Sequence, residues 1–331
     1  MNYWIVITTI HKPQAAIEAI STLCQRSDWH CVVVGDKKTP VEWQADNIHY
    51  LSVEAQKRQY PKLAELLPYH HYCRKNIGYL YAIQQGADCI LETDDDNLPL
   101  PQFGQNLHPE VQGDLVNGSD WVNVYRYFTD RLIWPRGNPL DTIHDTGHIV
   151  GVSRETCPIQ QFLADGDPDV DAIYRLLYQD EVYFDHRPPI ILEVGSWCAF
   201  NSQNTVFWKE AFPALYLPSH VSFRMTDIWR SFVAQIVLWS EQKKLCFSSA
   251  TVQQIRNQHD LMHDFSDEVT GYLNNRRICE ILLNEMQTWK KAMPMAQKVQ
   301  LAWRALYQHQ FIEKRELDIL DCWIDMARIP V

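Results

Sequence analysis

Three consecutive aspartates follow a short apolar segment in the first third of the chain. The apolar residues 89–91 are typical of a buried strand, but a strand cannot bury Asp94, Asp95 and Asp96 together without compensating charge. Mg²⁺ and Mn²⁺ prefer carboxylate oxygens and can bridge them to a diphosphate. The pattern predicts Mn²⁺ or Mg²⁺ bound by Asp94 and Asp96 and nucleotide contacts from Asp94 and Asp95. A solvated acidic turn is the alternative.

Residues at the ends of neighbouring elements could complete a nucleotide site around these carboxylates. We expect Thr8 and Thr9, at the end of the first strand, to line it. Asp36 follows the second strand, where a carboxylate can accept hydrogen bonds from a base or ribose, although an Asx turn or helix cap fits equally well. Arg74 and Lys75 open the helix before the acidic cluster. An anion there would relieve their repulsion with the helix dipole, and ordinary surface charge is the alternative.

Two later segments carry further candidates. Asp227 lies in the first turn of a predicted helix, where it could act as a general base toward an acceptor hydroxyl. Taken alone, the pattern favours the alternative, a first-turn acid stabilised by the helix dipole, with Thr226 as N-cap. His259 and His263 are four residues apart and would share one face of a helix. The pattern lacks the glutamate of a zinc protease, which argues against that class. We expect one of the two, assigned as His259, to join the metal, and the other to be a surface or core histidine.

The elements that must position these residues alternate between strand and helix patterns. Apolar, β-branched runs at residues 4–10, 31–34 and 48–53 predict strands, and a fourth strand leads into the aspartates. Helical spacing connects them over residues 13–24 and 72–86. This alternation predicts an α/β fold with a mostly parallel, twisted sheet flanked by helices. Such sheets bind ligands at the carboxyl ends of their strands.

The rest of the chain reads as loops followed by helices. No GxGxxG or GxxxxGK[ST] follows any predicted strand, so bound phosphates would need a metal and basic side chains. Long loops between residues 114 and 225 are predicted to contact substrate. Helical patterns cover residues 226–240 and the C-terminal part. We therefore divide the chain into a catalytic domain, residues 1–265, and a C-terminal helical extension, residues 266–331.

Composition excludes several classes of partner. The chain has 30 basic and 41 acidic residues and a net charge of −11, which disfavours nucleic acid or an anionic membrane surface as partner. Its nine scattered cysteines form no CxxC pair, which argues against a disulfide framework and a structural zinc site. No stretch resembles a signal peptide or approaches the length of a membrane span. We expect a cytoplasmic protein, and the oligomeric state stays open.

Several segments together resemble the STELLO-type glycosyltransferases, from the first strand to about residue 275. The matching segments are IVITTI, VVVGDKKTP, LPYHHYCRKNIGYLYAIQQGA, ILETDDDN, DPDVDAIYRL, VSFRMTDIWR and RNQHDLMHDF. The resemblance implies a GT-A-like fold for nucleotide-diphospho-sugar transfer, with a metal-dependent aspartate motif and a hydroxyl-bearing acceptor. The plant members are Golgi membrane proteins linked to cellulose synthesis. Because this sequence shows no membrane anchor, we expect neither that location nor that partnership.

Within this resemblance, Asp167, Asp169 and Asp171 are expected either to shape the sugar or acceptor pocket or to form an acidic helix start. Two other functions stay open. One is a non-catalytic scaffold or regulator that kept the fold, against which the intact acidic triplet counts. The other is a sugar nucleotidyltransferase or a phosphohydrolase. The loop after the first strand, residues 8–13, lacks the glycines that a nucleotidyltransferase would normally need.

Overall fold

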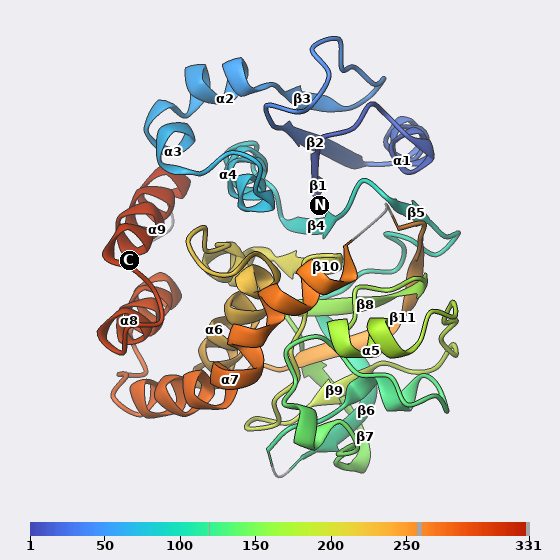
Figure 1. Ribbon diagram of the computed structural model, residues 1–331, viewed down its shortest axis with the longest axis vertical. Coiled ribbons are helices and arrows are strands. Elements are labelled where there is room, and N and C mark those ends of the chain that lie inside the picture. Colours follow the sequence, from blue (N-terminus) through green and yellow to red (C-terminus); the bar gives the residue numbers. More distant parts are fainter. Residues whose placement is uncertain (119, 257–259, 329–331) are drawn as a thin grey trace.

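The protein is built around one large mixed sheet (Figure 1). Its structure, a computed structural model, describes residues 1–118, 120–256 and 260–328. The strands in these ranges are β1 (Tyr3–Thr9), β2 (Trp29–Gly35), β3 (His49–Leu51), β4 (Cys89–Thr93), β5 (Asn97–Pro99), β6 (Glu110–Asn117), β7 (His148–Thr156), β8 (Ile159–Gly166), β9 (Ile190–Leu192), β10 (Asn204–Trp208) and β11 (Leu245–Gln254). Their order is β3-β2-β1-β4-β10-β8-β11-β9-β6-β7, with β5 paired to β11.

The first four strands of this order run parallel, so their carboxyl ends meet at one edge of the sheet. Thr9 at the end of β1 lies beside Gly35 at the end of β2. Val6 of β1 pairs with Glu92 of β4, which places the residues after β4 at the same edge. Strand β10 then runs antiparallel to β4 and to β8.

Side chains of β1 alternate between the two faces of the sheet, and both faces are buried, as expected for a central strand. Ile5 and Ile7 are buried on one face of the sheet with Ile17 of the first helix, whereas Trp4 and Val6 are buried on the other face. A strand covered on both faces needs a continuous apolar run, and that is the pattern of its sequence.

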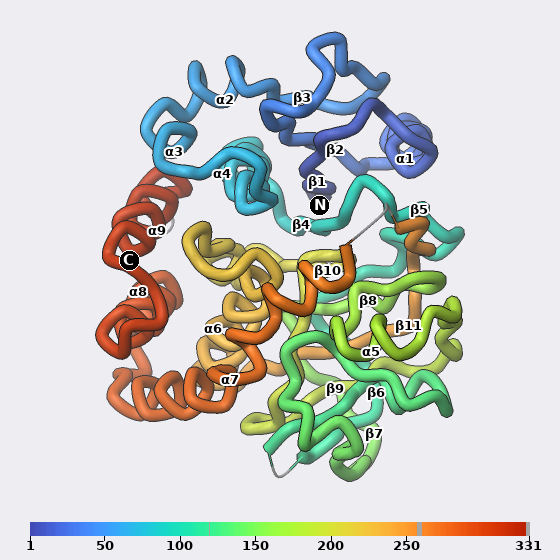
Figure 2. The backbone as a smooth tube through the Cα atoms, viewed as in Figure 1, coloured from blue at the N-terminus to red at the C-terminus, as the bar shows by residue number. Residues whose placement is uncertain are grey.

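Helices cover both faces and extend along one side of the molecule. Those in the described ranges are α1 (Ala15–Arg26), α2 (Val53–Gln59), α3 (Pro61–Leu66), α4 (Lys75–Gln84), α5 (Ala172–Leu177), α6 (Thr226–Ser240), α7 (Leu261–Met286), α8 (Met295–Gln308) and α9 (Lys314–Ala327). Figure 2 shows α9 lying beside α3 and α4, which are far from it in sequence. The predicted α/β class, with flanking helices and a helical C-terminal part, is confirmed.

The C-terminal helices are joined to the sheet by buried polar contacts. Glu316 of α9 is fully buried and accepts hydrogen bonds from the backbone N–H groups of Ser219 and His220. The indole Nε1 of Trp323 donates to the carbonyl of Asn76 in α4, at 2.9 Å. Because buried polar groups need such partners, α9 fixes both the loop before α6 and the helix before the acidic cluster.

One predicted strand is shorter than expected. The strand predicted at residues 48–53 ends at Leu51, because Ser52 is the N-cap of α2 and its side chain accepts a hydrogen bond from Ala55 N. The apolar pattern thus continues into a helix start rather than along the strand.

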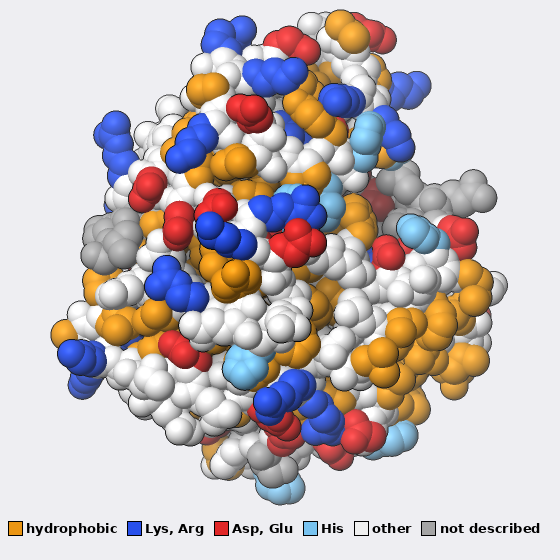
Figure 3. Space-filling view, turned by 60° about the vertical axis from the view of Figure 1, so that its left-hand side comes forward, with side chains coloured by type: hydrophobic (Ala, Val, Ile, Leu, Met, Phe, Trp, Pro, Cys, Tyr) orange, Lys and Arg blue, Asp and Glu red, His pale blue; other side chains and the backbone are white. Residues whose placement is uncertain are grey.

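Charged side chains of both signs are interspersed over the face that Figure 3 presents, with no single continuous basic surface on that face. Within the described ranges, no helix is both long enough and apolar enough to cross a bilayer.

Candidate active site

A cavity of about 600 Å³ opens at the carboxyl edge of the parallel strands. Most of the residues predicted from the sequence line it. They are Thr8, Thr9, Asp36, Arg74, Asp94, Asp95, Asp96 and Asp227. Lys75 lies directly behind the cavity and contacts Asp94. His259, the predicted third metal ligand, lies outside the described residues.

Lys75 anchors the first aspartate rather than facing the cavity. Its side chain is fully buried, and Nζ donates to the Asp94 carboxylate, to Thr93 O and to Ser202 O at 3.0, 3.0 and 3.2 Å. An ammonium has three donors, so all of them are used. Burial nevertheless raises the pKa of Asp94 to about 7, with the Lys75 charge opposing the rise and the Asp96 charge adding to it.

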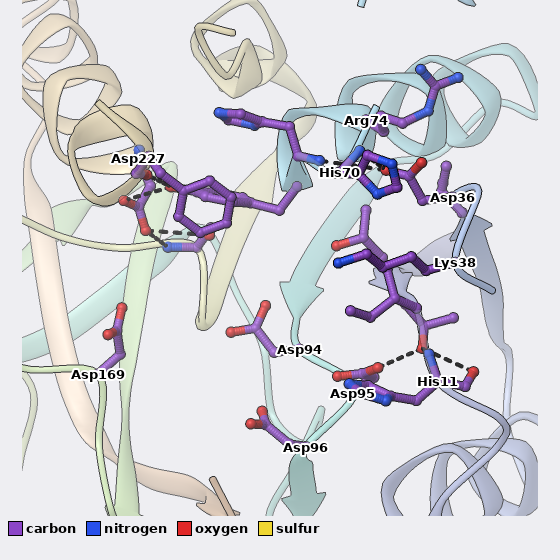
Figure 4. A pocket seen from close by; sticks show the side chains of 18 of the residues that line it. His11, Asp36, Lys38, His70, Arg74, Asp94, Asp95, Asp96, Asp169 and Asp227 are labelled. Atoms are coloured by element: carbon purple, nitrogen blue, oxygen red, sulfur yellow. Dashed lines mark hydrogen bonds between the residues drawn. The ribbon is translucent and has the colours of Figure 1, made fainter. Parts of the chain in front are cut away.

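The carboxylates of Asp94, Asp95 and Asp96 do not all point the same way. Figure 4 shows Asp94 and Asp96 pointing toward the side of the cavity where Asp169 lies, whereas Asp95 points toward His11. Asp95 Oδ2 accepts a hydrogen bond of 2.5 Å from the Thr9 hydroxyl. Burial raises the pKa of Asp95, and the neighbouring Asp96 charge contributes to the rise. Asp94 and Asp96 therefore form the pair that could share one ion.

The chemistry of this donor set fits a divalent cation. Burial and mutual repulsion destabilise the ionised carboxylates, and a cation would relieve both effects. Within the described ranges, no group of three or more His, Cys, Asp or Glu side chains is arranged to hold a metal ion. Mg²⁺ sites, however, commonly use one or two carboxylates and complete the shell with water and substrate phosphates. Two aspartates at the rim of a cavity match that arrangement.

Asp36 lines the cavity beside the ends of β1 and β2. Oδ1 accepts a hydrogen bond from Lys37 N, and Oδ2 accepts from the backbone N–H groups of His70 and His71. These bonds hold His70 in a left-handed conformation, with φ at 57°. Asp36 thus forms the local turn that the sequence offered as one alternative and also lines the cavity, while its contact with a base or ribose stays a prediction.

Arg74 lines the cavity, but its charge is directed elsewhere. Arg74 is 1% exposed, and its Nε and Nη2 donate to Gln56 Oε1 while Nη1 donates to Leu67 O. It also stacks over the Tyr69 ring at 4.5 Å. Arg74 therefore supports the loop beside the cavity, and its main donors are already engaged.

Other basic side chains, which no sequence pattern singled out, face the cavity. Lys38, His11 and His70 line it, and Figure 4 shows the Lys38 side chain extending into it. Lys38 lies in the turn after β2, next to Asp36. Its position directly after a predicted strand is the sequence feature that could have identified it as a site residue.

Asp227 is embedded in an ion pair at the opposite wall. Its two carboxylate oxygens accept hydrogen bonds from Nη1 and Nη2 of Arg136, both at 3.0 Å, and further ones from Tyr72 OH and Ser202 N. Burial alone would raise the pKa of Asp227, but the Arg136 guanidinium holds it below the usual range. A carboxylate with a lowered pKa and occupied lone pairs is a weak base. Its geometry favours a structural role over the predicted general base, although the N-cap of α6 is Met225 and not Thr226 as the alternative assumed.

Arginines and Asp169 complete this wall. Asp169 accepts hydrogen bonds from Arg136 and Arg224 at 2.5 and 2.7 Å, and Arg256 lies 3.7 Å away. Despite burial, these arginines hold the pKa of Asp169 well below its usual range. Asp171 instead caps α5. The arginines come from irregular segments or from a helix start, so no periodic pattern marked them.

His263 lies away from the cavity. Its side chain is 72% exposed, and Nε2 lies 3.8 Å from Asp267 on the same helix. Asp260 caps that helix by accepting from the backbone N–H groups of Met262 and His263. His263 is therefore a surface histidine, as one of the two histidines was expected to be.

Comparisons with known proteins give the family. A solved structure described as "Crystal Structure of a Mycobacterial Protein" shares 7% sequence identity at a TM-score of 0.43, covering 84% of this chain and 74% of that chain. The sequence model of the STELLO glycosyltransferases matches residues 224–328. "Probable glycosyltransferase STELLO2" of Arabidopsis thaliana is 30% identical over 85% of this chain, and "Probable glycosyltransferase STELLO1" is 31% identical over 71%. The matches span only 39% and 33% of these curated relatives. By this similarity, the chain belongs to the family of STELLO glycosyltransferases.

Proposed function

We propose that the chain is a GT-A-type glycosyltransferase that moves a sugar from a nucleotide-diphosphate donor to a hydroxyl acceptor. The observation that carries the proposal is the acidic triplet after β4, which lies in a cavity of about 600 Å³ beside the ends of β1 and β2. Asp94 and Asp96 would hold Mn²⁺ or Mg²⁺. When bound, this ion would neutralise charge on the departing diphosphate.

The nucleotide half of the site is the edge formed by β1 and β2. Thr8 and Asp36 line it, and the Thr9 hydroxyl fixes Asp95 on this side. The Lys38 ammonium and the His11 and His70 rings would face the diphosphate. Because Arg74 and Lys75 are engaged by protein acceptors, we assign the phosphate contact to Lys38.

The opposite half is a rigid wall rather than a proton acceptor. Arg136 joins Asp227 to Asp169, and Tyr72 OH donates to Asp227 from the loop before α4. This network connects the segment before α4 with the start of α6. We therefore assign to Asp227 the positioning of both segments around the donor sugar.

Titration calorimetry with UDP- and GDP-sugars in the presence of Mn²⁺ tests the function directly. We expect at least one donor to bind the unmodified chain and the variant Asp318→Ala, which removes an exposed carboxylate of α9. Asp96→Ala should weaken binding at least about tenfold, because a metal ligand is removed. If every donor failed to bind the unmodified chain, or if Asp96→Ala bound as tightly as the control, the proposal would be wrong.

A further inference from the structure

A second cavity, of about 400 Å³, borders the candidate active site. It lies between the end of β11, the loop after α5 and the first turn of α7. Gln254 and Arg256 line both cavities. The two cavities thus share one wall, which is only two side chains wide in the described part of the chain.

The shared wall reaches the acidic cluster. Gln254 Nε2 lies 3.4 Å from Asp96 Oδ2, and Arg256 is held by Asp167 at 3.1 Å. The Asp167 side chain lines the second cavity. A ligand that occupies the second cavity would therefore end at Gln254, one side chain away from the aspartate assigned to the metal.

The lining of the second cavity combines an aromatic face with amide and carboxylate groups. Tyr178 is 50% exposed, and its ring lies 5.0 Å, centroid to centroid, from that of Tyr174. Gln179, Gln253 and Asp180 also line the cavity. Aromatic rings offer a flat apolar surface, and amides and carboxylates offer donors and acceptors beside it. A sugar ring presents the matching pair, an apolar C–H face and a rim of hydroxyls.

Charge argues against an anionic ligand in this cavity. Its two arginines already have carboxylate partners, because Arg256 contacts Asp167 and Arg175 contacts Asp264 at 2.7 Å. Among the described residues, the remaining charged groups of the lining are Asp180 and Glu181, which are acidic. A phosphate would therefore meet net negative charge, whereas a neutral polyhydroxyl ligand would not.

We propose that the second cavity is the acceptor subsite and that the acceptor is a neutral glycan. This inference rests on the proposed function and names its acceptor class. In the transfer, the acceptor oxygen bonds to the anomeric carbon, and the bond from that carbon to the diphosphate oxygen breaks with its electron pair. The acceptor hydroxyl gives its proton to water. Tyr178 holds the glycan ring, and the wall of Gln254 and Arg256 directs its end toward the donor.

Saturation-transfer-difference NMR with neutral disaccharides (maltose, lactose and cellobiose) tests the subsite on the full chain. We expect at least one of them to bind, and Tyr178→Ala to weaken that binding about tenfold, because the stacking surface is lost. Tyr307→Ala is the matched control, since it removes a partly exposed tyrosine from α8, outside both cavities. Tyr178 is half exposed, so its replacement should leave the melting temperature unchanged.

The results separate this inference from the function on which it rests. If no disaccharide bound, or if Tyr178→Ala bound disaccharide as tightly as Tyr307→Ala, the assignment of the acceptor subsite would be wrong, even if nucleotide sugars still bound. If disaccharides bound at Tyr178 but no nucleotide sugar bound with Mn²⁺, the saccharide site would be supported and the proposed transferase function would be overturned.

Discussion

Replacing Asp227 with alanine removes the carboxylate that pairs with both terminal nitrogens of Arg136. Both side chains are 3% exposed, so the change leaves a buried guanidinium with fewer partners. Breaking a buried ion pair costs about 3–5 kcal/mol. Arg136 keeps Asp169 at 2.5 Å, so we expect the lower value, about 3 kcal/mol. For 331 residues, at about 2.1 cal/mol/K of unfolding entropy per residue, this lowers Tm by about 4 °C.

Differential scanning calorimetry of Asp227→Ala, with Asp318→Ala as control, measures this loss. The control should melt with the unmodified chain, because its carboxylate is exposed. Slow metal-dependent release of nucleotide from a donor sugar provides the activity readout. An unchanged Tm together with a loss of about a thousandfold or more in turnover would identify Asp227 as a base and refute the positioning role.

Three further predictions follow from the charges of the site and from its support. The pKa of Asp94 is raised from its ordinary value near 4 to about 7, so between these two pH values the metal-free fold binds one proton more than the unfolded chain. Stability should therefore fall as pH rises from about 4 to 7 and level off above 7, and Asp94→Asn should flatten that dependence in thermal melts at pH 4 to 8. Lys38→Ala should weaken nucleoside-diphosphate binding about tenfold in calorimetry, whereas Lys37→Ala, whose ammonium lies over the Tyr69 ring, should not. Glu316→Ala should cost about 3 kcal/mol in urea denaturation, because it strips the acceptor from buried N–H groups.

Residues that follow strands were the predictable part of the site. Thr9, Asp36 and Asp94 each come after an apolar run whose pattern marks a buried strand, and parallel pairing brings such ends to one edge. The sequence pattern and the sheet geometry together therefore place them around one cavity.

The orientation of the other predicted site residues depends on contacts between segments that are distant in sequence. The burial of Arg74 depends on Gln56, and that of Lys75 depends on the Ser202 carbonyl, more than one hundred residues away. A local sequence pattern cannot identify such partners. The position of Arg74 and Lys75 at a helix start therefore predicted phosphate contacts, but both side chains are engaged by protein acceptors. Arg136 likewise comes from an irregular segment, where no hydrophobic period marks an inward-facing position, whereas Asp169 was expected near the pocket only through the family resemblance.

The pairing of Asp94 and Asp96 around one divalent ion is the claim on which the proposed function depends. Crystals grown with Mn²⁺ and a nucleoside diphosphate, measured for manganese anomalous scattering, test it most directly. We expect one anomalous peak in contact with the carboxylates of Asp94 and Asp96 and with the diphosphate oxygens. A nucleotide bound in the cavity with no manganese at these carboxylates would contradict the account.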